Sequence, residues 1–310
     1  MNYALETSVP EALVAVGLPI YNNKRHVAQS IEAILRQTFG DFVLIISDNA
    51  STDGTAAICE EFARQDPRVH YHRNPVNIGL YANFNRVFQL SRSKYFKWAT
   101  GDDYSAPDTL ADAVAVLESD PSIALCYPRI VIIDGEGREQ GRYDDKLHLM
   151  MDDPVERFLS VIDYMGPLVN HHLGLLRSDA IRQTRLFGTH ASADVGFIAE
   201  MSLYGKFHEV KKHQFYRRFH SESSSWKRGD PEHEARRLHA ANVRRVPFGT
   251  WRYHQWFWSA VLRSPLRLEQ KVRAMKRLGK FVYWDGKPLL GELRRDIPPL
   301  LGLANEQSKR

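Results

Sequence analysis

The first hundred residues alternate short apolar runs with segments in which apolar side chains recur every three to four positions. The runs Leu13–Ile20 and Asp41–Asp48 are typical of strands that are buried on both faces. This alternation of strand and helix predicts βαβ units and a mainly parallel central sheet flanked by helices. The expected helices are 27–37, 55–64 and 79–91, and the other strands are 68–73 and 95–99.

The pattern continues less regularly after residue 108. A turn signal at 134–137 predicts a hairpin over 129–142, and Gly205 is expected to end a helix over 193–204. Residues 144–170 carry no clear pattern, and 221–226 is expected to be a polar loop. The remaining expected elements are a helix at 109–117, strands at 123–127 and 208–219, and helices from 231 onward.

Composition places the chain among soluble globular proteins, with 310 residues, of which 43% are hydrophobic and 25% charged. The sequence contains no apolar run of ~18 residues and does not begin like a signal peptide. Two cysteines, Cys59 and Cys126, fit two buried thiols in a reducing compartment better than a disulfide. We therefore expect a cytoplasmic protein.

Charge divides the chain into two parts. Residues 1–225 contain 23 Lys and Arg and 29 Asp and Glu, whereas residues 226–310 contain 19 and 8. We expect a catalytic domain over 1–225, with halves at about 11–105 and 106–225, and a basic helical extension over 226–310. Such an extension favours an anionic partner.

Polar side chains follow the predicted strands at their carboxyl ends, which is where ligands bind in parallel sheets. Asp102 and Asp103 are adjacent carboxylates and would suit Mg²⁺ or Mn²⁺, although a capped turn explains them equally well. Asp48 ends an apolar strand and needs a partner, either a nucleobase N–H or an Asx-turn with Ser51. The sequence has neither a Rossmann nor a P-loop glycine motif.

Four motifs together resemble the family 2 inverting glycosyltransferases of GT-A fold. They are Pro19-Ile20-Tyr21-Asn22, SDNASTDGT at 47–55, RNPVNIGLYANFN at 73–85 and ATGDDY at 99–104. The resemblance covers about 11–225, and the combined set is specific although no single motif is.

The resemblance implies a nucleotide site and a metal site. Asp103 would be the main ligand of Mn²⁺ or Mg²⁺, Asp102 would lie near the ribose and diphosphate as well as the metal, and His220 would complete the metal site. Gly101 replaces an acid that is usual in the family. The residues implied to bind the nucleotide are Pro19, Tyr21, Asn22, Asp48, Asn77, Gly79 and Asp102.

The resemblance also implies a catalytic base, Asp194, in a segment where Ala193 replaces the usual Glu. The alternative for Asp194 is an acid favoured at a helix N-terminus, and a surface histidine would explain His220 equally well. The remaining implied residues are Arg217, Arg218 and Lys227 facing the diphosphate, and His171 and His172 on the acceptor side.

The expected function is transfer of a sugar, with inversion, from a nucleotide-diphosphate sugar, UDP being favoured, to a hydroxyl acceptor. The acceptor would be a carbohydrate or a lipid-linked sugar in glycan, polysaccharide or glycolipid assembly. A non-catalytic nucleotide-sugar-binding protein and a sugar nucleotidyltransferase are the alternatives. No nucleic-acid partner is expected.

The C-terminal part combines aromatic residues at 251–258 with an apolar stripe, Leu268, Val272, Met275 and Val282, among Lys and Arg. A basic amphipathic helix beside tryptophans predicts contact of 251–283 with a membrane surface, on the inner face of the membrane. The stripe would equally suit packing on the catalytic domain or on a second subunit in a homo-oligomer.

Overall fold

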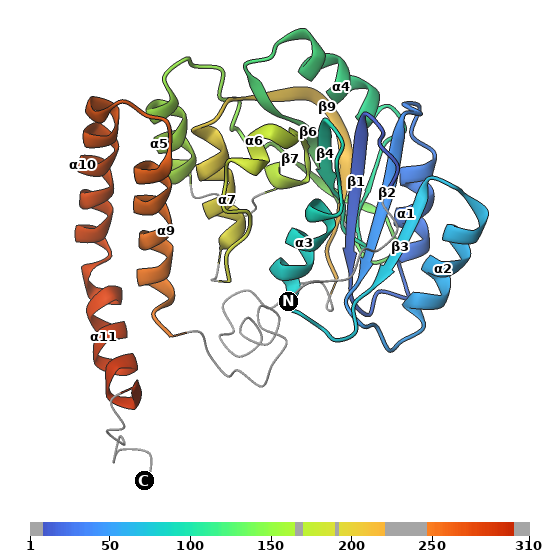
Figure 1. Ribbon diagram of the computed structural model, residues 1–310, viewed down its shortest axis with the longest axis horizontal. Helices are drawn as coiled ribbons and strands as arrows, with labels where there is room; N and C mark the ends of the chain where they lie inside the picture. Colours follow the sequence, from blue (N-terminus) through green and yellow to red (C-terminus); the bar gives the residue numbers. More distant parts are fainter. Residues whose placement is uncertain (1–8, 165–169, 190–191, 221–246, 301–310) are drawn as a thin grey trace.

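The computed structural model describes residues 9–164, 170–189, 192–220 and 247–300, and Figure 1 shows an α/β arrangement with a curled sheet at its centre. The strands occur in the order β3-β2-β1-β4-β8-β6-β9-β5, with β7 paired to β6. Their bounds are β1 Val14–Ile20, β2 Phe42–Asp48, β3 Val69–Arg73, β4 Tyr95–Trp98, β5 Tyr104–Ser105, β6 Ile123–Ile133, β7 Glu139–Tyr143, β8 Leu175–Arg177 and β9 Lys206–Arg218.

Helices cover both faces of this sheet. Helices α1, α2 and α4 contribute to the core cluster on one face, and α3, α5, α7 and the C-terminal helices contribute to the cluster on the other. Their bounds are α1 Val27–Leu35, α2 Thr55–Gln65, α3 Leu80–Gln89, α4 Thr109–Ser119, α5 Pro154–Tyr164, α6 Ser178–Arg182, α7 Ala193–Ser202, α9 Gly249–Arg263, α10 Leu268–Trp284 and α11 Gly286–Leu300; a 3-10 turn, η1, spans His171–Leu173.

The parallel half of the sheet is confirmed. Strand β1 pairs in parallel with both β2 and β4, and β2 pairs in parallel with β3. The second half is mixed, because β8 runs antiparallel to β4 and β6 whereas β9 runs parallel to β6. The register places Ile20 beside Asp48, so the ends of β1 and β2 lie side by side.

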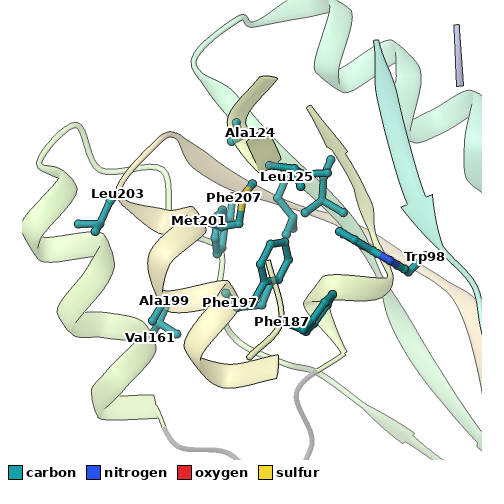
Figure 2. Close-up of a cluster of buried hydrophobic side chains, with 14 of the residues drawn as sticks. Trp98, Ala124, Leu125, Val161, Phe187, Phe197, Ala199, Met201, Leu203 and Phe207 are labelled. Carbon is teal, nitrogen blue, oxygen red and sulfur yellow. The ribbon is translucent and has the colours of Figure 1, made fainter. Parts of the chain in front are cut away.

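Aromatic side chains fill the core between the sheet and α7 (Figure 2). The Phe197 ring lies 4.6 Å from the Phe187 ring and 5.4 Å from the buried Trp98 ring, centroid to centroid. Burial of an aromatic side chain of this kind stabilises a fold by roughly 1.5–3 kcal/mol. Because Trp98 ends β4 and Phe197 lies in α7, this cluster joins the parallel half of the sheet to the second half.

The C-terminal helices are part of the same structure. Phe257 and Val261 of α9 and Ala274 and Leu278 of α10 are buried in the cluster that contains Phe197. The expected domain limit at 225/226 lies outside the described residues. Within the described residues, no helix is both long enough and apolar enough to cross a membrane.

Candidate active site

The carboxyl ends of β1, β2 and β4 converge at one edge of the sheet, as the sequence predicted. The segments that follow these strands are joined by hydrogen bonds. The backbone N–H of Asn49 donates to the Ile20 carbonyl over 2.8 Å, and the Asn23 amide group donates to Asp102 Oδ1 over 2.5 Å. The loops after the three strands therefore form one polar surface.

Asp48 is fully buried at the end of β2, and both of its carboxylate oxygens are engaged. Oδ1 accepts from the Ser51 N–H over 2.9 Å, which is the Asx-turn that the sequence left open. Oδ2 accepts from the Tyr71 hydroxyl over 2.8 Å and from Arg73 Nη1 over 2.7 Å. A nucleobase would therefore meet Arg73, whose side chain is 42% exposed, before it reached Asp48.

The loop after β3 is held by side-chain amides. Asn49 donates to Asn77 Oδ1 over 2.7 Å, and the same oxygen accepts from the Gly79 N–H over 2.9 Å. Gly79 has a φ of 90°, a backbone conformation that other residues rarely adopt. Asn83 of α3 donates to the Ser47 carbonyl over 2.8 Å and thereby ties this helix to β2. Asn77 and Gly79 thus shape the loop, and their expected contact with a nucleotide stays a prediction.

The three residues expected at the nucleobase differ in accessibility. Pro19 is buried within β1, whereas Tyr21 is 49% exposed and Asn22 is exposed. Asn22 adopts a φ of 47°, its N–H donates to Ser51 Oγ, and its side-chain oxygen accepts from the Thr52 N–H. Only Tyr21 and Asn22 therefore offer side chains to a ligand at the end of β1.

The acid pair after β4 divides into an inner and an outer carboxylate. Asp103 is 9% exposed and accepts from the Arg218 N–H over 2.8 Å and from the Thr100 hydroxyl over 2.6 Å. Burial raises the pKa of Asp103, and the nearby Arg217 opposes that shift. The Asp102 side chain is 25% exposed and bonds to Asn23. A Cβ at Gly101 would lie 2.9 Å from Asn23 Cγ, so the glycine allows this contact.

Histidines lie beside the outer carboxylate. His220 Nε2 is 3.6 Å from Asp102 Oδ1, so the strand-end acid and the expected third ligand come together. The His26 ring lies 5.2 Å from the His220 ring, and burial lowers the pKa of His26. Sequence reasoning missed His26, although it follows the β1 motif by only four residues. An imidazole and carboxylates form a donor set that suits Mn²⁺.

The described residues nevertheless contain no group of three or more His, Cys, Asp or Glu side chains arranged to hold a metal ion. Asp102 and His220 fit a cation that takes its other ligands from a substrate diphosphate and water. Asp103, the expected principal ligand, points toward the Arg218 backbone and Thr100 instead.

The basic residues at the end of β9 differ from the expectation. Arg218 is 4% exposed and does not face a diphosphate, because its guanidinium donates to the carbonyls of Asp102, Asp134 and Gly135 and to Gln29 Oε1. It secures the 134–137 turn against α1. Arg217 donates to Asn170 Oδ1. Lys227 lies outside the described residues.

A second buried charge lies beneath the acid pair. Lys97 of β4 is buried, donates to the Leu173 carbonyl and lies 5.6 Å from the centroid of the Phe215 ring. Burial lowers its pKa to about 8, and Asp103 is the main group that opposes this shift. The inner carboxylate is therefore flanked by the positive charges of Lys97 and Arg217.

The expected acceptor-side histidines are not equivalent. His171 is fully buried, its ring packs edge-on against Tyr127 at 4.6 Å, and burial lowers its pKa to about 3. It therefore cannot touch an acceptor hydroxyl, and this expectation is wrong for His171. His172 is partly buried among Phe84 and Phe187.

Asp194 lies in the first turn of α7, with Oδ1 accepting from the Val195 N–H over 3.0 Å. Helix α9 covers this turn, because a Cβ at Gly196 would lie 2.9 Å from the Trp256 ring. Beside Trp256 is a hollow of about 400 Å³, and the described residues that line it include no carboxylate. Its lining residues are Arg185, Thr189, Arg252, Gln255, Trp256 and Ser259.

Parts of this chain are similar in sequence to known proteins. Chondroitin synthase of Escherichia coli is 26% identical over 224 residues, which are 72% of this chain and 31% of that protein. The putative glycosyltransferase EpsE of Bacillus subtilis (strain 168) is 39% identical over 106 residues, or 34% of this chain and 38% of that protein. The chain thus spans about a third of the length of these two relatives.

Solved structures have the same fold. TarS 1–349 of S. aureus in complex with UDP-GlcNAc superposes with a TM-score of 0.62 at 14% identity, covering 86% of this chain and 71% of that one. The mannosyltransferase PcManGT of Pyrobaculum calidifontis, in complex with GDP-Man and Mn²⁺, gives a TM-score of 0.50 at 15% identity, covering 91% and 81%. These likenesses establish a GT-A-like fold. The profile of the family described as Glycosyl transferase family 2 matches residues 15–180, more than half of the chain, and the protein therefore belongs to glycosyl transferase family 2.

Proposed function

We propose that the chain transfers a glycosyl group, with inversion, from a nucleoside diphosphate sugar to an acceptor hydroxyl. The observation that carries the proposal is the convergence of Asp48, Asp102 and His220 at the carboxyl edge of the sheet. Proteins of the same fold bind UDP-GlcNAc and GDP-Man. We favour UDP as the nucleotide and glycan, polysaccharide or glycolipid assembly as the setting.

In this proposal the nucleobase lies against Tyr21, with its carbonyl oxygens toward the guanidinium of Arg73. Asp48 and the Ser51 carbonyl hold that guanidinium in place. Asn77 and Gly79 keep the loop beside it in shape. In this proposal Arg73 contacts the base, and Asp48 serves to hold Arg73 in position.

A divalent cation would supply charge neutralisation for the leaving diphosphate. Asp102 and His220 would hold that cation, and Asp103 would contribute its negative charge from the inner position. Lys97 and Arg217 keep the inner carboxylate compensated when no substrate is present.

Asp194 is the proposed base. Its carboxylate takes the proton of the acceptor hydroxyl while the acceptor oxygen bonds to the anomeric carbon and the bond from that carbon to the diphosphate breaks. Attack from the face opposite the diphosphate inverts the anomeric configuration. The hollow beside Trp256 is where we expect the acceptor to approach, and His172 remains an acceptor-side candidate.

The test uses the full chain and a panel of UDP- and GDP-sugars, with donor hydrolysis measured with and without Mn²⁺. We expect Asp194→Asn to retain nucleotide binding and to lose a factor of ~10² to 10⁴ in rate. Asp179→Asn makes the same change at an aspartate whose side chain is 92% exposed, and it serves as the matched control. Nucleotide-dependent thermal stabilisation without any turnover would instead favour the non-catalytic binding protein.

A further inference from the structure

The outer side of the C-terminal helices carries several exposed apolar side chains. Helices α10 and α11 follow one another along the side of the molecule farthest from β1–β3 (Figure 1). At 1.5 Å per residue, the two helices provide roughly 50 Å of helix. Large apolar side chains remain exposed along them: Leu268 is 78% exposed, Tyr283 84% and Trp284 58%, and Val272, Leu290 and Ile297 are also exposed.

These side chains fall on defined helix faces. At 100° per residue, Leu268, Val272 and Tyr283 lie within an arc of about 120° that also contains Glu269, Lys276 and Lys280. In α11, Leu290 and Ile297 share a face with Lys287 and Arg294. We call the ten residues the outer face: Leu268, Val272, Lys276, Lys280, Tyr283, Trp284, Lys287, Leu290, Arg294 and Ile297.

Packing on the catalytic domain does not use this face. Helix α10 packs through the buried Ala274 and Leu278 and is held to α5 by ion pairs from Arg273 to Asp153 and from Arg277 to Asp163. Leu268 and Val272, which belonged to the predicted apolar stripe, stay exposed. In α9, by contrast, Phe257 is 3% exposed and Tyr253 and Trp258 pack against the same core, whereas Trp251 is 38% exposed.

The charge on the outer face is strongly positive. Residues 249–297 contain eleven Lys and Arg and four Asp and Glu. Three of the four acids bond within the protein: Glu292 accepts from the Thr250 N–H, Asp296 accepts from the Phe248 N–H, and Asp285 bonds to His254. The fourth acid, Glu269, is exposed and pairs with Arg267 at 3.6 Å. Within the described residues, no ion pair involves Lys276, Lys280, Lys287 or Arg294.

We propose that the outer face binds the surface of an anionic lipid bilayer, with α10 and α11 lying along it. Lys and Arg attract acidic headgroups, and the exposed Leu, Tyr and Trp side chains enter the boundary between headgroups and acyl chains. A two-fold contact between copies through this face would place cations against cations, which disfavours a second chain as the occupant. The proposal is independent of the transferase chemistry, because binding to vesicles requires no turnover.

The experiment is co-sedimentation of the full chain with vesicles of phosphatidylcholine alone or containing 30% phosphatidylglycerol, at 50 and 500 mM NaCl. We expect binding only to the anionic vesicles, strongest at low salt because added ions screen the attraction. The variant K276Q/K280Q/R294Q removes three cations at ~1 kcal/mol each and should weaken binding about a hundredfold. A matched variant, R36Q/R64Q/K211Q, removes three exposed cations elsewhere and should bind as the wild type does.

Insertion of the aromatic side chains is tested separately. Brominated acyl chains should quench part of the tryptophan fluorescence of the wild type, and W284F should lose that quenched part. The variant L268S/Y283S changes highly exposed residues and should weaken the binding that remains at high salt. Equal weakening by R36Q/R64Q/K211Q, no binding to anionic vesicles at low salt, or a dimer that L268S/Y283S dissociates would each overturn the proposal.

Discussion

Two buried ionisable side chains near the candidate site should change the stability of the fold in opposite directions as the pH rises. Variants that remove one side chain at a time can measure the two pH dependences separately. Asp145 is 2% exposed and His171 is fully buried, with Asp145 Oδ2 4.0 Å from His171 Nε2. Burial raises the pKa of Asp145 to about 7 and lowers the pKa of His171 to about 3. In the folded protein near pH 5, Asp145 therefore carries a proton and His171 does not.

The direction in which each group changes stability with pH follows from proton linkage. Between about pH 4 and 7 the folded state holds a proton on Asp145 that the unfolded state has lost, so this group makes stability fall as pH rises. Between about pH 3 and 6.5 the unfolded state holds a proton on its histidine that His171 lacks, so this group makes stability rise. At about 1.4 kcal/mol per pKa unit, the two contributions are about 4 and about 5 kcal/mol and nearly cancel where they overlap.

Variants that remove Asp145 or His171 alone should show the pH dependence that the remaining group causes. Relative to the wild type, Asp145→Asn should gain stability by about 1.4 kcal/mol per pH unit between pH 4.5 and 6.5, and His171→Leu should lose it at a similar rate. Urea unfolding followed by circular dichroism at pH 4.5, 5.5 and 6.5 measures both slopes. The double variant should run parallel to the wild type. Single variants that also run parallel to the wild type would refute the reasoning, as would ¹⁵N shifts of a charged His171 ring at pH 5.

Three further perturbations test the packing beneath the site. Arg73→Ala should unfold at a lower urea concentration than Arg73→Lys, because it leaves the buried Asp48 carboxylate without its cation. Gly17→Ala should cost about 1–3 kcal/mol in urea unfolding, since its Cβ would lie 2.4 Å from Phe96 Cζ, whereas Gly40→Ala, with no atom nearby, should be neutral. Lys97→Met should lose about 3 kcal/mol relative to the wild type between pH 8 and 10.5, where the unfolded lysine is charged and the folded one is not; a flat difference would contradict the lowered pKa of this buried amine.

Local patterns were sufficient for the parallel half of the sheet. The strands at residues 14–20 and 42–48 are mostly apolar and are buried at every position, as expected for strands covered on both faces. The strand-end acids were found for the same reason, since Asp48 and the pair Asp102 and Asp103 interrupt apolar segments. The helix over 154–164 was missed because two acids and Pro154 precede its apolar positions.

Contacts that depend on strand register were beyond local reasoning. Tyr71 and Arg73 reach Asp48 only because β3 pairs in parallel with β2 and places Arg73 beside Asp48. Arg218 seemed free to face a diphosphate, but the 134–137 turn folds back onto it and supplies carbonyl acceptors. A cation near a candidate site has a ligand role only if the protein leaves its donors available, and that depends on tertiary contacts.

The apolar stripe in the C-terminal part had two explanations that helical spacing could not tell apart, and the structure separates them. Leu268, Val272, Met275 and Val282 predicted either packing or a surface contact, because helical spacing says which residues share a face and nothing about what covers it. In the structure the small residue Ala274 and Leu278 make the inner contact, and Met275 packs beside them. The most exposed residues of the stripe lie among lysines that form no ion pair with any described residue, while the nearby acids accept hydrogen bonds from the start of α9. Apolar and cationic groups left together in this way are stabilised by burial only against a surface that is itself anionic and apolar, and a bilayer is such a surface.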